Sequence, residues 1–157
     1  MAAHFYSANY SVARQRFRDA AAKCSWWQAG YPIDAPGPHG EELSIDVAVS
    51  TRMPCKHALV VSSGLHGVEG FFGSAVQLAA LSALAGRPEA DGVRMIFIHA
   101  LNPYGFAWSR RVNEENIDLN RNFLTGDELY AGSPDGYAGL DSLSNPTTPP
   151  RRWDYVP

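Results

Sequence analysis

The sequence predicts an α/β domain in which helices flank a mixed, largely parallel sheet. Three observations lead to this fold class: apolar residues at helical spacing near the start of the chain, apolar runs of strand length further on, and a helix-length segment between two of those runs. A strand, a helix and a strand in that order form a crossover, and such sheets bind ligands beyond the carboxyl ends of their strands. The 157 residues, 45% of them hydrophobic, suit a single domain spanning residues 1–157.

The amino-terminal elements follow from periodicity and from breakers. Residues 11–27 contain few breakers and carry apolar side chains near helical spacing, which predicts an amphipathic helix. Glycine and proline crowd residues 30–40, which predicts a loop. Residues 43–49 alternate large apolar residues with Ser, Asp and Ala, as a half-buried strand does.

The remaining elements follow from two short apolar runs. The runs at residues 58–61 and 93–99 predict fully buried strands, and the apolar segment at 71–84 between them predicts a core helix. Residues 125–157 are rich in Gly, Pro, Ser, Thr and Asp and show little apolar periodicity. They predict a loop-rich, irregular carboxyl-terminal tail.

Composition and charge argue against several kinds of partner. A formal net charge of -3 provides no basic surface for nucleic acid or for an anionic membrane. The apolar segment at 71–84 is shorter than the ~20 residues of a membrane span, and charged residues interrupt the amino-terminal segment where a signal sequence needs an apolar run. Cys24 and Cys55 show neither metal-site spacing nor a disulfide framework. We therefore expect a cytoplasmic protein with no nucleic-acid or membrane partner.

The first polar cluster is GLHGVEG at residues 64–70, where the strand at 58–61 gives way to the core helix. His66 and Glu69 lie three residues apart, so an imidazole on the loop and a carboxylate in the first helical turn can converge on one cation. Other interpretations stay open: His66 caps the helix while Glu69 complements its amino terminus, or the loop is an oxyanion hole, although no GxSxG nucleophile elbow follows. A phosphate-binding loop is a further alternative, but Glu69 would repel the phosphate.

The second polar cluster follows the strand at 93–99. It contains NPYGFAW at residues 102–108, then Arg110 and Arg111, then DLNRNF at residues 118–123. Guanidinium groups polarise a carbonyl or bind a carboxylate through two parallel hydrogen bonds. Each arginine is equally compatible with an ordinary salt bridge at the surface.

Taken in order, HxxE after an apolar strand, NPxGF, a pair of arginines and DxNRNF resemble the zinc metallocarboxypeptidase superfamily, over residues 58–123. That superfamily also contains deacylases of the succinylglutamate desuccinylase and aspartoacylase type. The longer motifs GLHGVEG, NPYGFAW and DLNRNF resemble those of a bacterial branch of unknown function. The resemblance implies that the chain is the amino-terminal portion of a zinc carboxypeptidase-like domain.

The resemblance also implies how a metal is held. His66 and Glu69 would bind one zinc ion, and Asp118 would accept a hydrogen bond from the far nitrogen of His66 and fix its tautomer. In the superfamily the third ligand is a histidine on a later strand, but no histidine follows His99 in this chain. His99 itself is a candidate ligand because it ends the strand that leads to the second cluster.

The same resemblance implies the substrate and the reaction. Arg111, or alternatively Arg110, would stabilise the oxyanion during zinc-dependent hydrolysis of a peptide or amide bond. Asn120 and Arg121 would hold the free carboxylate of a small peptide or an N-acyl amino acid.

Two groups of the superfamily's active site have no counterpart in the sequence. These are the third zinc ligand and the glutamate that transfers the proton. Glu128 does not match that glutamate, because the superfamily carries it on a still later strand. We therefore expect a truncated chain that binds zinc weakly and is inactive alone, unless a complementing downstream polypeptide supplies the missing groups. The alternative is a non-catalytic module that binds carboxylates through Asn120 and Arg121.

Overall fold

The computed structural model describes residues 3–50, 54–87, 92–122 and 136–144. The chain divides into two compact units, Met1–Phe123 and Leu124–Pro157. The elements of the first unit are, in order, η1 (Ala3–Phe5), α1 (Tyr10–Lys23), β1 (Trp27–Pro36), β2 (Glu42–Val49), β3 (His57–Ser62), α2 (Gly67–Leu84), β4 (Val93–His99) and α3 (Pro103–Trp108). The second unit contains α4 (Tyr137–Ser144).

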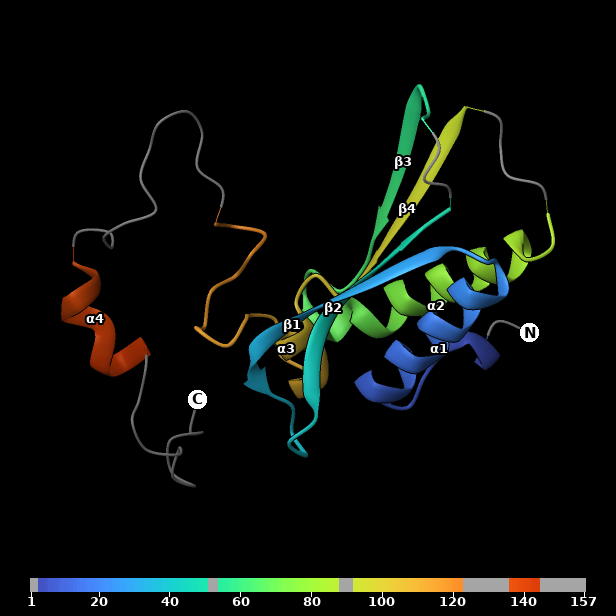
Figure 1. Ribbon diagram of the computed structural model, residues 1–157. Coiled ribbons are helices and arrows are strands. Elements are labelled where there is room, and N and C mark those ends of the chain that lie inside the picture. The colour runs from blue at the N-terminus through green and yellow to red at the C-terminus, as the bar shows by residue number, and fades with distance from the viewer. Residues whose placement is uncertain (1–2, 51–53, 88–91, 123–135, 145–157) are drawn as a thin grey trace. The chain divides into compact units, whose positions relative to one another are not determined.

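The four strands form one mixed sheet in the order β1-β2-β4-β3 (Figure 1). β2 pairs antiparallel with both β1 and β4, whereas β3 and β4 run parallel, with Val60 beside Ile96. The helix α2 connects the two parallel strands. The predicted α/β class with a mixed sheet is therefore confirmed. One of the three strand pairs in the described sheet is parallel and the other two are antiparallel.

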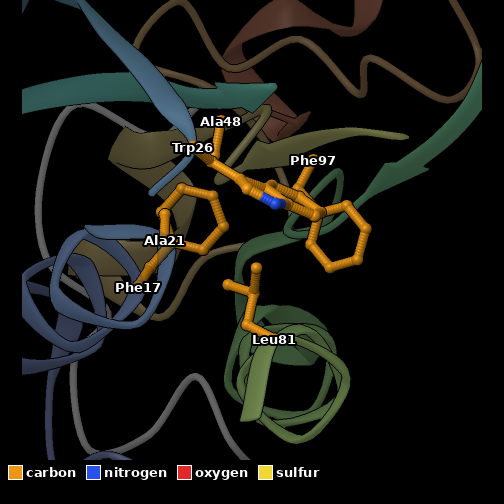
Figure 2. Close-up of a cluster of buried hydrophobic side chains, with 6 residues drawn as sticks. All are labelled: Phe17, Ala21, Trp26, Ala48, Leu81 and Phe97. Carbon is orange, nitrogen blue, oxygen red and sulfur yellow. The ribbon is translucent and has the colours of Figure 1, made fainter. Parts of the chain in front are cut away.

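The helices α1 and α2 lie side by side against the sheet (Figure 1). Where they meet it, apolar side chains from both helices and from the strands pack together (Figure 2). The rings of Trp26 and Phe97 meet edge to face with their centroids 5.2 Å apart. Burying an aromatic side chain of this kind contributes roughly 1.5–3 kcal/mol, so this cluster holds both helices on the sheet. Its members are Phe17, Ala21, Trp26, Ala48, Leu81 and Phe97.

A second apolar cluster fixes α3 against the two long helices. Phe106 of α3 is fully buried, and its ring packs edge to face against Tyr10 of α1 and Phe71 of α2. An added Cβ at Gly70 would lie 2.8 Å from the Phe106 ring, so α2 needs a glycine where this ring lies. The cluster therefore determines where the loops after β3 and β4 lie relative to one another.

The strand β1 corrects the prediction of a loop at residues 30–40. β1 runs from Trp27 to Pro36 and contains Gly30 and Pro32. It is an edge strand, where proline is tolerated because one side of the strand needs no ladder hydrogen bond. The register with β2 also shifts between Pro32 and Pro36.

The strand β3 lies where it was predicted, but it is not fully buried. β3 pairs with β4 alone in the described sheet, and Leu59 and Val60 are 52% and 54% exposed. An apolar run predicts burial, but it does not tell whether a strand has a neighbour on each side. The prediction of full burial was therefore wrong for β3.

Two helices also differ from the predictions in extent. α1 ends at Lys23 instead of residue 27, because Ser25 adopts a left-handed conformation with φ of 58°. The helix α4 occupies part of the tail, residues 125–157, that was predicted to be loops. Residues 125–135 and 145–157 of that tail lie outside the described residues. By length and composition α2 would suit a membrane span, and 39% of that segment is buried inside the protein.

Candidate functional site

The two polar clusters lie at the carboxyl ends of the parallel neighbours β3 and β4. The chain leaves β3 into the turn before α2 and leaves β4 into the turn before α3. The two turns are joined directly, because the Leu101 amide donates to the Ser63 carbonyl at 2.9 Å and the Asn102 amide donates to the Gly64 carbonyl at 2.8 Å. Gly64 has φ of +67°, a conformation that glycine adopts without strain.

His66 stands at the start of α2 and connects the two clusters. It occupies the N-cap position, but its side chain makes no capping hydrogen bond, so the helix-cap interpretation of His66 was wrong. Instead, its Nε2 lies 3.0 Å from Oδ1 of Asp118, and its Nδ1 lies 3.5 Å from Oε1 of Glu69. The imidazole therefore has one carboxylate on each side.

Asp118 is the centre of the polar contacts. Its Oδ1 also accepts a hydrogen bond from the Asn120 amide at 2.9 Å, and its Oδ2 lies 2.8 Å from Nε of Arg111 and 3.3 Å from Nε of Arg121. The hydrogen bond from Arg111 is the main reason that the pKa of Asp118 is held well below its usual range, and the bonds from His66 and Asn120 act in the same direction. Asp118 is therefore a carboxylate at neutral pH.

The charge of Asp118 determines where the His66 proton lies. An ionised carboxylate only accepts hydrogen bonds, so Nε2 of His66 must be the donor in this pair. A neutral imidazole with its proton on Nε2 has a lone pair on Nδ1, which is the atom that faces Glu69. A lone pair and a carboxylate oxygen that face each other at 3.5 Å attract only if a proton or a cation lies between them.

The structure separates the two arginines of the second cluster. Arg111 reaches Asp118, whereas the guanidinium of Arg110 donates from Nη2 to Oδ1 of Asn116 at 3.1 Å. Both Arg111 and Arg121 contact Asp118 through Nε, and their side chains are 51% and 74% exposed. The roles proposed for these residues, and for Asn120, stay predictions.

His99 does not join the pair formed by His66 and Glu69. It is fully buried, its Nε2 lies 3.1 Å from Oγ of Ser74, and its ring stacks on Phe17 with centroids 4.9 Å apart. Its Nδ1 has no hydrogen-bond partner among the described residues, and burial lowers the pKa of His99 to about 4. Across the described part of the chain no three His, Cys, Asp or Glu side chains form a metal-binding group.

A hollow of about 280 Å³ adjoins the His66–Glu69 pair. It is lined by the carboxyl end of β3 and the first two turns of α2, including Ser62 and Phe72 as well as His66 and Glu69 themselves. The pair is therefore open to a further ligand from this side. Neither Ser62 nor Phe72 was a candidate from the sequence, because neither residue type signals such a role.

Asn102 is the residue of this region that the sequence argument overlooked. It is buried, it caps α3 by accepting a hydrogen bond from the Gly105 amide at 2.8 Å, and Pro103 follows it at the first helical position. Asn followed by Pro is a typical helix start, so a signal for the cap was present in the sequence.

Among curated proteins there is no match. Among solved structures, the glutaminyl cyclase of Macrostomum lignano is similar, with a TM-score of 0.37 and 17% identity, over 58% of this chain and 31% of that chain. A family model matches residues 6–156, nearly the full length. The protein therefore belongs to the family described as "Protein of unknown function (DUF2817)".

Proposed function

We propose that the chain provides part of the active site of a zinc-dependent hydrolase of peptide or amide bonds, similar to carboxypeptidases or N-acyl-amino-acid deacylases. The observation that carries the proposal is the arrangement around His66. Asp118 holds Nε2, and Nδ1 faces a Glu69 oxygen at 3.5 Å. The resemblance of the two clusters to the zinc metallocarboxypeptidase superfamily supports the same proposal.

The spacing of the two ligand atoms fits zinc. Ligands about 2.0–2.2 Å from a tetrahedral zinc ion are about 3.4 Å apart, close to the observed separation of Nδ1 and Oε1. The hydrogen bond from the other ring nitrogen to a carboxylate is the usual arrangement of a metal-binding histidine. When bound, zinc would act as a Lewis acid on the scissile carbonyl and on water.

The arginines suit the substrate. The Nε atoms of Arg111 and Arg121 bind the same oxygen of Asp118, so their terminal nitrogens are left to meet a ligand. We assign Arg111 to the developing oxyanion, and Arg121 with Asn120 to the free carboxylate of a small peptide or an N-acyl amino acid. The third ligand and the proton-transferring group would come from a complementing polypeptide, docked beside the hollow next to Glu69.

A non-catalytic carboxylate-binding module is the second candidate. It is favoured by the exposure of Arg121, whose Nε, like that of Arg111, is held by Asp118. In that case Asn120 and Arg121 would hold a carboxylate with no turnover.

A calorimetric titration of the purified chain with zinc separates the two candidates. We expect weak binding of one ion, weakened about tenfold or more by His66→Ala and by Glu69→Gln, since each removes a ligand. His39→Ala and Glu115→Gln are matched controls at exposed positions and should leave the affinity unchanged. Absence of zinc binding, together with N-acetylglycine binding that is indifferent to a chelator, would establish the module instead.

A further inference from the structure

The contacts of Asn102 join the turn before α2, the start of α3 and the arginine loop. The residue lies three positions after the end of β4 and is 1% exposed. Its Oδ1 accepts from the Gly105 amide at 2.8 Å, and its backbone amide donates to the Gly64 carbonyl at 2.8 Å. Its Nδ2 donates to the Arg111 carbonyl over a longer distance of 3.5 Å. One buried side chain thus contacts both the α3 turn and the backbone of Arg111.

The neighbouring backbone contacts hold the arginine loop in the same place. The Gly67 amide donates to the Arg110 carbonyl at 3.0 Å, and the Arg110 amide donates to the Gly105 carbonyl at 2.7 Å. A Cβ at Gly105 would lie 2.5 Å from Nδ2 of Asn102 and 2.7 Å from the Arg110 oxygen, so the loop approaches too closely for any side chain there. Two consecutive carbonyls of the arginine loop are therefore held by hydrogen bonds. The Gly67 backbone amide holds that of Arg110, and the Asn102 side chain holds that of Arg111.

We propose that Asn102 is a positioning residue that directs Arg111 toward the His66–Glu69 pair. This inference rests on the proposed function, in which the Arg111 guanidinium meets the substrate. Arg111 is held at its backbone carbonyl by the side-chain amide of Asn102 and at its Nε by Asp118, which in turn contacts His66. The amide side chain of Asn102 carries, on two separate atoms, the acceptor that caps α3 and the donor that holds Arg111.

Two substitutions separate the capping role from the positioning role. Asn102→Ser keeps an oxygen that can cap α3, but its single hydroxyl is too short to reach the Arg111 carbonyl as well. Asn102→Asp keeps the size and the capping oxygen but places a second acceptor against the Arg111 carbonyl. Should one of them fail to fold, the other still tests the inference. Asn9→Ser is the matched control. Asn9 caps α1 by accepting from the Val12 amide at 2.9 Å, so this variant makes the same Asn-to-Ser substitution at the cap of a different helix.

Two measurements report on Arg111, and a third reports on the metal site. The first is the exchange rate of the Arg111 Nε proton by ¹⁵N NMR. The second is the affinity for N-acetylglycine, whose acyl carbonyl Arg111 would meet in the proposed function, by chemical-shift titration. The third is the zinc affinity by calorimetry. In both Asn102 variants we expect exchange about tenfold faster and N-acetylglycine affinity about tenfold weaker, the size of effect that one lost hydrogen bond produces. Zinc affinity should stay unchanged, since His66 and Glu69 are not contacted by Asn102.

The result with the control variant decides the outcome. Unchanged exchange and unchanged N-acetylglycine affinity in both Asn102 variants would overturn the inference, as would equal changes in Asn9→Ser, because the effect would then be a general loss of stability. The proposed function fails separately, if the unmodified chain binds no zinc. The exchange of the Arg111 proton tests the positioning role in either case.

Discussion

At the scale of single residues, the carboxylate of Asp118 connects the candidate metal site with the candidate anion site. One oxygen meets His66 and the other meets the two arginines, Arg111 and Arg121. The two candidate sites therefore share a single carboxylate. The sequence placed Asp118 beside His66 only by resemblance. The contact with Arg121 is local, three residues along the chain, whereas the contact with Arg111 depends on how the loop after α3 folds back.

Asp118→Asn tests the link to the metal site. The amide keeps the size of the side chain but removes the charge that keeps the His66 proton on Nε2, so Nδ1 becomes a poorer ligand. We expect zinc affinity to fall about 10–100-fold, as is usual when the hydrogen-bond partner of a metal-binding histidine is lost. Isothermal titration calorimetry measures this, with Glu115→Gln as the control in the same loop. Equal affinities in the two variants would contradict the assignment.

The buried His99 predicts how stability depends on pH. In the unfolded chain this histidine binds a proton below about pH 6.5, whereas in the folded protein burial delays protonation to about pH 4. The unfolded state therefore binds more protons between these values, so the stability that is fully present above pH 6.5 falls as the pH decreases through this window. The expected loss is on the order of 2–3 kcal/mol.

Urea unfolding of the protein and of His99→Gln between pH 4 and pH 7 measures the contribution of His99. The glutamine can still hydrogen-bond to Ser74, but it does not titrate. We expect the difference in unfolding free energy between the two proteins to change with pH. The unfolding free energy of His39→Gln, a variant at an exposed position, should depend on pH as that of the unmodified protein does. If the unfolding free energies of His99→Gln and of the unmodified protein differ by the same amount at every pH, His99 does not titrate as expected.

At the scale of elements, the start of α2 is packed directly against the start of α3. A Cβ at Gly67 would collide with the backbone of Gly105, so Gly67→Ala should push the two helix starts apart. We expect a loss of roughly 1–3 kcal/mol of unfolding free energy, typical of overpacking. Chemical denaturation measures it. Gly139→Ala in α4 is the control, because nothing lies within 4 Å of that position, and there alanine should be neutral or favourable.

The elements also show how far the sequence predicts the structure. The strand, helix and strand that carry the two clusters were predicted from apolar runs, since those runs and the glycines that end them are local signals. The strand β1 was missed because Gly30 and Pro32 normally interrupt strands, and the edge position that tolerates them is a property of the whole sheet. The exposure of β3 was missed for the same reason.

At the scale of the whole molecule, both apolar clusters belong to the first unit. Every buried residue of the two clusters lies between Tyr10 and Phe106, within the unit Met1–Phe123. A fragment of residues 1–123 should therefore fold. Its unfolding free energy, measured with urea, should equal that of the whole chain to within about 0.5 kcal/mol. Circular dichroism of the two proteins checks this. A fragment without a cooperative transition would show that the first unit depends on residues 124–157.

The unprotected strand β3 has a consequence for handling the protein. In the described sheet its outer edge pairs with no strand, and this edge carries exposed Leu59 and Val60 with no proline or lysine between His57 and Ser62. Such an edge is a template on which strands of other molecules can assemble into aggregates. We expect light scattering to rise with protein concentration and time, and Leu59→Lys to suppress it, whereas the same change at the exposed Val12 of α1 should not. Dilute, cold storage would then limit this assembly before each titration.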